Sequence, residues 1–287
     1  MNLAPGIEIR DLTHLEQLRE VIEIEKRVWG YSDAEEAVPL PMLAAGVRRG
    51  AIVLGAFDGL AMAGATYSFP AIKDRRATHW SHMLGVLEPY RDRGVGRLLK
   101  LRQRERALAL GIDLIEWTFD PLQAANGYFN LARLGAVVEQ YEVNLYGSSS
   151  SPLWRGTESD RFVAQWNIRE PHVERRLTRR GPIIRGSDTL AAACVLEARC
   201  VAGHVAPGEP NLEDESRRLR VEIPASFAPI QVERPDLAAL WRATTRVVFT
   251  TYLPRGYRVV DFWFERARAC GSYLLARRDI AERREAA

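Results

Sequence analysis

A short basic stretch with two glycines has the residue types and spacing that best suit ligand binding in this sequence. Residues 91–96 read Arg-Asp-Arg-Gly-Val-Gly, and they open a segment that reads as a long helix ending near Gly111. The first amides of a helix lack partners within it and lie at the positive end of its dipole, so they bind anions such as phosphate. Gly94 and Gly96 have no side chain, which lets an anionic ligand approach the backbone. We therefore predict an anion site here.

The spacing of the glycines separates the known types of phosphate loop. A P-loop requires GxxxxGK[ST], which the sequence lacks. A dinucleotide-binding loop requires GxGxxG, and Leu99 stands where the third glycine would be. The pattern that remains is [QR]xxGx[GA], preceded by an apolar strand and a Pro-x-Tyr sequence.

This pattern resembles the acyl-CoA-binding motif of the GNAT superfamily of N-acetyltransferases, over about residues 5 to 147. The resemblance implies that the loop amides and nearby guanidinium groups bind the pyrophosphate of coenzyme A. It also implies that the pantetheine arm pairs with the main chain of the fourth strand, and that a polar residue after the fifth strand contacts the cofactor. The expected cofactor-binding residues are Leu84, Gly85, Val86, Arg91, Arg93, Gly94, Val95, Gly96, Arg97 and Asn126.

Transfer of an acyl group from a thioester to an amine needs a group that protonates the departing thiolate. GNAT enzymes usually supply a tyrosine four residues before the glycine that ends the helix after the fifth strand. Counted back from Gly135, that position holds Leu131. Tyr128 lies three residues earlier, on a neighbouring part of the same predicted helical face. We expect Tyr128 to act as a displaced acid or to pack against its neighbours.

The amine must also lose a proton, and His82 is the best-placed candidate base. It lies two residues before Leu84 and is expected on the same face of the fourth strand. His79 is expected on the opposite face, so the two histidines should not chelate one metal, and no metal is predicted. Glu116 and Asp120 are alternative bases, and many GNAT enzymes deprotonate the amine through water.

The elements around these residues alternate between strand and helix patterns. Strands are predicted at 7–12, 51–56, 60–69, 77–86, 112–119 and 136–146, and helices at 13–29, 39–49, 95–110 and 120–134. We predict an α/β fold of the α+β type, with a mixed, mostly antiparallel GNAT sheet flanked by helices. This acyl-CoA-binding domain would span residues 1–147.

Residues 148–287 are predicted to form a second α/β module that begins at a serine run. Strands are expected at 162–168, 219–224, 257–264 and 272–276, and one helical face is expected to carry Leu237, Leu240, Trp241, Thr244 and Val248. The spacing Arg-xxx-Val-Val recurs at Arg133 and at Arg255, which indicates either a degenerate GNAT-like half or chance. This module is expected to shape the acceptor pocket or a dimer interface rather than to bind cofactor.

Composition limits the class of protein. The chain has 287 residues, 47% hydrophobic and 27% charged, with a net charge of +3. No apolar run reaches the ~20 residues that cross a bilayer, and three cysteines without a CxxC suit a reducing cytoplasm. Aromatic residues are not interleaved with the arginines, so nucleic acid is not an expected partner, and the lack of a long apolar run means that a membrane is not expected either.

The leading hypothesis is therefore a cytoplasmic acyl-CoA-dependent N-acyltransferase from a bacterial two-module subgroup of GNAT proteins. It would use acetyl-CoA, or another acyl-CoA, to modify an amine of a small molecule. The rival hypothesis is an acyl-CoA-binding regulatory protein with little or no transfer activity. Assembly as a homodimer is left open.

Overall fold

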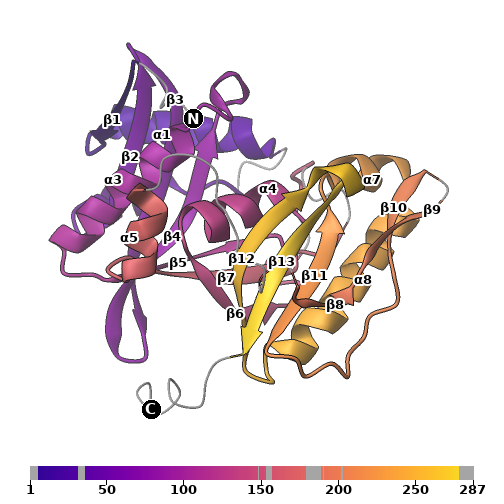
Figure 1. Ribbon diagram of the computed structural model, residues 1–287. Helices are drawn as coiled ribbons and strands as arrows, with labels where there is room; N and C mark the ends of the chain where they lie inside the picture. Colours follow the sequence, from indigo (N-terminus) through magenta and orange to yellow (C-terminus); the bar gives the residue numbers. More distant parts are fainter. Residues whose placement is uncertain are drawn as a thin grey trace. The chain divides into compact units, whose positions relative to one another are not determined.

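The computed structural model describes residues 6–31, 36–147, 149–152, 157–178, 189, 191–201 and 203–277 (Figure 1). They form two compact units that interleave along the chain. The first unit contains residues 1–117, 149–154 and 167–169, and the second contains 118–148, 155–166 and 170–287. The sequence predicts a single boundary after residue 147, between a cofactor-binding domain and a second module. This division into two functional domains stays a prediction. Within the described residues, no helix is both long and apolar enough to cross a membrane.

The first unit is built on a mostly antiparallel sheet with the strand order β1-β2-β3-β4-β5. Its strands are β1 (Ile7–Asp11), β2 (Ile52–Asp58), β3 (Ala61–Lys73), β4 (Arg76–Val86) and β5 (Leu114–Phe119), of which β5 runs on into the second unit. The first three junctions are antiparallel, whereas β4 and β5 run parallel. This confirms the predicted mixed sheet.

Helices cover both faces of this sheet. Helices α1 (Leu15–Trp29) and α2 (Leu40–Val47) share an apolar core with one face, to which Tyr67 and Met83 contribute. Helix α3 (Val95–Ala109) contacts the opposite face, where Lys100 donates a hydrogen bond to Ser81. Ser81 is paired with Ser68, one residue beyond Tyr67, and alternate residues of a strand face opposite sides.

The first helix starts one residue later than predicted. Its N-cap is His14 rather than Thr13, and the His14 amide donates to Oε1 of Gln17 at 3.4 Å. It ends, as expected, at Gly30, whose φ of 65° lies in the left-handed region that favours glycine.

Within the second unit, the strands of the large sheet follow the order β7-β6-β12-β13-β11-β8. Its strands are β6 (Val137–Glu142), β7 (Arg161–Asn167), β8 (Ala193–Leu196), β11 (Arg218–Pro224), β12 (Tyr257–Glu265) and β13 (Cys270–Arg277). Strands β9 (Ala198–Val201) and β10 (His204–Pro207) form a separate hairpin. Val138 of β6 pairs with Val259 of β12, which brings the two Arg-xxx-Val-Val segments side by side.

Aromatic side chains form the core of the second unit. Phe162 lies 4.5 Å from the Phe249 ring and 5.5 Å from the Tyr273 ring, and Phe262 lies 4.7 Å from Tyr273, measured between ring centroids. These residues come from β7, α8 (Pro235–Tyr252), β13 and β12. The core therefore joins strands and a helix that are far apart in sequence.

The helices of this unit differ from the prediction in three respects. The predicted helix at 120–134 is a short α-helix, α4 (Ala124–Gly127), followed by a π-helix, η3 (Tyr128–Arg133). In α8, Leu240 is half exposed rather than buried, and the buried stripe instead includes Thr245 and Phe249. Helices α5 (Pro171–Thr178) and α7 (Ala228–Glu233) were not predicted.

Candidate active site

The predicted anion loop opens α3. Gly94 is the N-cap residue, with a φ of 84°, and the first helical hydrogen bond runs from the Leu98 amide to the Gly94 carbonyl. Gly94 has no side chain that could cap the first amides of this helix. A Cβ atom at Gly94 would meet no atom within 4 Å. An anion can therefore approach these amides directly.

Two arginines of the loop have their side chains fixed by neighbouring residues. Nε of Arg91 donates to the Val86 carbonyl at 3.0 Å, which ties the loop to the end of β4. The Arg93 guanidinium lies 5.4 Å from the centre of the Tyr90 ring, in cation–π range. The Pro-x-Tyr sequence thus forms a turn, η2 (Glu88–Tyr90), that supports the basic loop.

Strand β4 has an edge that a ligand can use. Its pairing with β5 is confined, among the described residues, to His79 with Ile115 and Trp80 with Glu116. On its other side, β4 pairs with β3 as far as Val86. Leu84 to Val86 are therefore paired with β3 along one edge, while their other edge lies beyond the residues that pair with β5. An extended ligand can bind to such an edge by main-chain hydrogen bonds.

A β-bulge changes the predicted orientation of His82. Ser68 pairs with Ser81 and the preceding residue, Tyr67, pairs with Met83, so His82 is the extra residue on β4. The His82 ring lies 6.0 Å from the Tyr67 ring and 6.3 Å from the Phe69 ring. Leu84 pairs with Thr66 and so faces the other side. The expectation that His82 and Leu84 share a face is therefore wrong.

His79 and His82 do face opposite sides, as predicted. His79 is fully buried, and its Nδ1 lies 3.1 Å from Oγ of Ser68. Burial lowers the pKa of His79 to about 4. Desolvation also lowers the pKa of His82, although its side chain stays exposed, so at neutral pH His82 is a neutral base that a ligand can reach.

The two alternative bases are engaged in ion pairs. Nζ of Lys73 donates to Glu116 at 2.5 Å. Both guanidinium NH₂ groups of Arg242 donate to Asp120, at 2.7 and 2.8 Å. Each carboxylate therefore already has a cationic partner, whereas the exposed His82 ring lies beside the Tyr67 and Phe69 rings.

The candidate acid and the predicted cofactor contact belong to the second unit. Leu131, the position of the usual tyrosine, is fully buried, whereas Tyr128 is half-buried and its ring lies 5.7 Å from that of Phe264. In η3 the Leu134 amide bonds the Phe129 carbonyl, five residues back, and this wider turn separates Tyr128 and Leu131 further than an α-helix would. Asn126 is exposed on α4.

Lys100 is a buried basic residue that the sequence pattern did not reveal. Its Nζ donates to Ser81 and to Gln103, each at 3.0 Å, and lies 3.7 Å from the centre of the Trp117 ring. Complete burial lowers its pKa to about 7. The one available signal was its identity as the only lysine among the arginines of α3.

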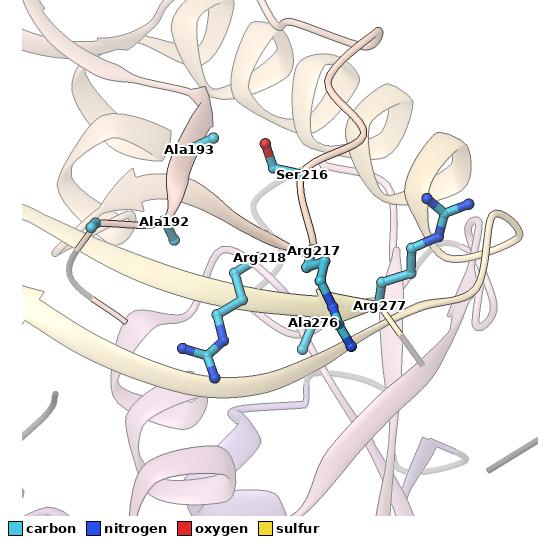
Figure 2. A pocket seen from close by; sticks show the side chains of 8 residues that line it. Ala192, Ala193, Ser216, Arg217, Arg218, Ala276 and Arg277 are labelled. Atoms are coloured by element: carbon cyan, nitrogen blue, oxygen red, sulfur yellow. The ribbon is translucent and has the colours of Figure 1, made fainter. Parts of the chain in front are cut away.

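One hollow of the surface contains none of the predicted site residues. It has a volume of about 680 Å³ and lies in the second unit, where the side chains of Arg217, Arg218 and Arg277 surround it (Figure 2). Ser216 and several alanines complete its lining. Its character is basic and polar.

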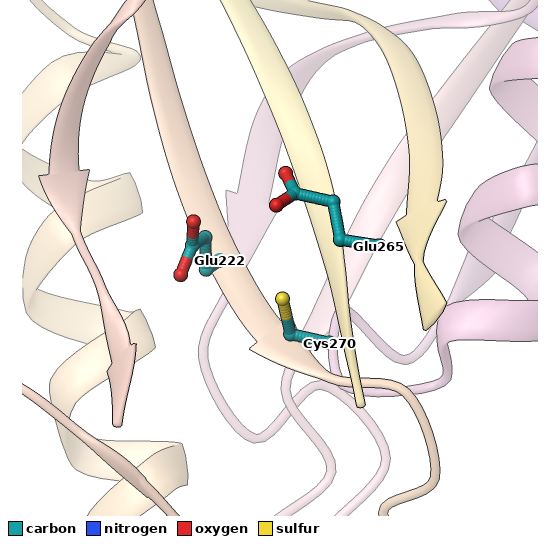
Figure 3. A group of neighbouring side chains, drawn as sticks. All are labelled: Glu222, Glu265 and Cys270. Atoms are coloured by element: carbon teal, nitrogen blue, oxygen red, sulfur yellow. The ribbon is translucent and has the colours of Figure 1, made fainter. Parts of the chain in front are cut away.

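A second cluster in that unit has the donor types of a metal site. Glu222, Glu265 and Cys270 bring their ligand atoms within 4.8 Å of one another (Figure 3). However, Arg268 donates to Glu222 at 2.6 Å and Arg220 donates to Glu265 at 3.2 Å. Burial and the nearby carboxylates raise the pKa of Cys270 to about 11. The two guanidinium groups therefore already neutralise the carboxylates that a cation would need.

Comparisons with known proteins give matches of structure alone. No protein-family model and no curated protein matches the sequence. An acetyltransferase of the GNAT family from Streptococcus pneumoniae is 17% identical, with a TM-score of 0.45, over 55% of this chain and 98% of its own. The ribosomal-protein-S18-alanine N-acetyltransferase from Escherichia coli is 16% identical, with a TM-score of 0.44, over 56% and 94%.

A chain of the NatC complex bound to a Gag peptide and CoA is 15% identical, with a TM-score of 0.45, over 57% of this chain and 99% of its own. Each of these three matches spans little more than half of this chain and nearly all of the other. Similarity at this level assigns neither a substrate nor a reaction, which must be argued from the residues themselves.

Proposed function

We propose that this protein is an acyl-CoA-dependent N-acyltransferase that transfers an acyl group, with acetyl-CoA as the expected donor, to an amine of a small molecule. The observation that carries the proposal is the continuity of β4 with α3. The edge of Leu84 to Val86 that lies beyond the β4–β5 pairing leads through the bond between Arg91 and Val86 into a helix N-terminus whose N-cap is a glycine. Coenzyme A has an extended amide-containing arm followed by a pyrophosphate. The arm would bind along the β4 edge, and the pyrophosphate would bind at the helix N-terminus.

The chemistry assigned to the side chains follows from their surroundings. His82 is exposed, and its lowered pKa makes it a proton acceptor at neutral pH, so we assign it the proton of the amine. Tyr128 is half-buried beside Phe264 and is assigned the proton that the departing thiolate receives. The amine attacks the thioester carbonyl, the new C–N bond forms, and the C–S bond breaks.

Calorimetric titration with coenzyme A tests the cofactor site. We expect Gly94→Glu to abolish binding, because a carboxylate would replace the anion at the helix N-terminus. Gly59→Glu is the matched control: Gly59 also has a positive φ, 62°, and a Cβ atom at Gly59 would likewise meet no atom within 4 Å. Equal affinity in wild type and Gly94→Glu would disprove the loop assignment.

Transfer itself is a separate question, because Leu131 occupies the usual position of the acid. Release of free thiol from acetyl-CoA, measured with a panel of small amines, distinguishes an enzyme from a binding protein. Amine-dependent release supports the transferase. Tight binding of coenzyme A without release by any amine supports the regulatory alternative.

A further inference from the structure

The turn between β5 and α4 is held by residues that lie more than a hundred positions later in the chain. Asp120 starts this turn, and its Oδ1 accepts the Leu122 amide at 2.9 Å while its main-chain carbonyl accepts the Gln123 amide at 3.0 Å. Arg242 of α8 makes two parallel hydrogen bonds to the Asp120 carboxylate. A bidentate pair of this kind fixes both the position and the plane of the carboxylate.

A second contact comes from β13. The Tyr273 hydroxyl donates to the Pro121 carbonyl at 2.8 Å, and Tyr273 is completely buried. A Cβ atom added to Gly127 would lie 2.8 Å from that hydroxyl and 3.0 Å from Cδ2 of Phe262. Helix α4 therefore rests directly on these two aromatic side chains, and only glycine allows this approach.

A third contact involves the candidate acid itself. Tyr128 follows Gly127, and its ring lies 5.7 Å from Phe264, which in turn lies 5.4 Å from Phe262. Residues 120–128 are thus fixed at Asp120 by Arg242, at Pro121 and Gly127 by Tyr273, and at Tyr128 by Phe264. All of these residues belong to the second unit.

We propose that Arg242 and Tyr273 are positioning residues for the transfer reaction, and that the C-terminal module serves to hold the turn that presents Asn126 and Tyr128. This inference rests on the proposed function. Neither residue touches the reacting atoms: each acts through the backbone of residues 120–128. A displacement of about 1 Å of a catalytic group can cost on the order of 10²-fold in rate.

The test uses Arg242→Lys, which keeps the charge but cannot form the parallel pair. We expect kcat for thiol release to fall about 10- to 100-fold, while the Kd for coenzyme A changes less than about twofold. Arg246→Lys is the matched control, because Arg246 lies one turn further along α8 and bonds Asp160 and Glu158 instead. Tyr273→Phe removes the bond to Pro121 and should lower kcat in the same direction.

A double-mutant cycle separates positioning from general damage. If Arg242 acts through Tyr128, then Arg242→Lys should lower kcat little further in a Tyr128→Phe background. An equal fold-loss in both backgrounds would overturn the proposal. So would a kcat for Arg242→Lys equal to that of Arg246→Lys.

Amide hydrogen exchange reports on the same contacts without any turnover. Faster exchange of the amides of residues 122–134 in Arg242→Lys, but not in Arg246→Lys, supports the positioning role. Unchanged exchange contradicts it. If the wild-type protein releases no thiol with any amine, the proposed function fails, and the exchange measurement still decides whether Arg242 holds this turn.

Discussion

The Trp29 side chain lies against the backbone of Gly85, so that a Cβ atom at Gly85 would be 2.9 Å from Cζ3 of the indole and 3.2 Å from Cγ2 of Val28. The last turn of α1 thereby packs directly on the central residue of the β4 segment that is expected to bind pantetheine. A change in the packing of α1 should therefore shift the backbone of residues 84–86, where the cofactor is predicted to bind.

Gly85→Ala should therefore affect both stability and binding. The methyl group must displace the indole and Val28, and overpacking of this kind costs about 1–3 kcal/mol in the free energy of unfolding. Because the displacement moves Leu84 to Val86, the affinity for coenzyme A should fall as well. Denaturant unfolding and calorimetry measure the two effects. Wild-type values in both measurements would show that the contact is not rigid.

His82 should set the acidic limb of the pH–rate profile. Desolvation places its pKa below the ordinary 6.5, so the neutral base form predominates at neutral pH and is lost only as pH falls below that value. We expect kcat/KM to decline below pH 6.5 in the wild type and His82→Gln to remove this limb and lower the rate. An acidic limb that persists unchanged in His82→Gln would exclude His82 as the base.

Tyr128→Phe tests the displaced acid. Loss of the hydroxyl should lower kcat by about 10²-fold, within the usual range for general acid catalysis, and leave the affinity for coenzyme A unchanged. The packing against Phe264 is retained in this variant, since only the hydroxyl is removed. Turnover equal to that of the wild type would assign Tyr128 a packing role only.

Lys100 should make the free energy of unfolding rise with pH between its folded and unfolded pKa values. Its folded-state pKa of about 7 lies below the unfolded value of 10.5, so between these values the unfolded chain binds more protons and stability rises with pH. Lys100→Met removes the cost of burying this ammonium group. The variant should be more stable than wild type, by on the order of a few kcal/mol, at or below pH 7, and its advantage should shrink toward pH 10.5.

Lys26→Met is the control for that comparison, because the Lys26 side chain is partly exposed and pairs with Glu23 on the surface. Its effect on unfolding should be small and nearly independent of pH in the same range. The quantity to compare is the difference in free energy of unfolding between the wild type and Lys100→Met. If this difference stays constant from pH 6 to pH 10, Lys100 is charged in the folded protein over that range.

Features that depend on neighbouring residues were predictable from the sequence. The loop at Gly94 and the helix that follows were correctly predicted, because glycine spacing and a polar helical pattern are local signals. The strands from β1 to β5 also agree with prediction within a few residues. Hydrophobic alternation and the Asp58-Gly59 turn are sufficient to define them.

Features that depend on distant packing were not predictable. Strict alternation placed His82 and Leu84 on one face, whereas one extra residue in β4 separates them. The π-helix at Tyr128 and the exposure of Leu240 likewise follow from contacts made by β12, β13 and the rest of the second unit. Arg242 had no sequence signal at all, because its partner Asp120 lies 122 residues earlier.

The pairing of Val138 with Val259 protects an edge that would otherwise attract other strands. Where β6 pairs with β12, its main-chain groups are used within the chain, and they are not available to a β-strand of a second molecule. Continuous-sheet association through β6 is thereby blocked, and the second half of the chain acts there as a built-in partner. A homodimer of this protein would have to form through a surface other than this edge.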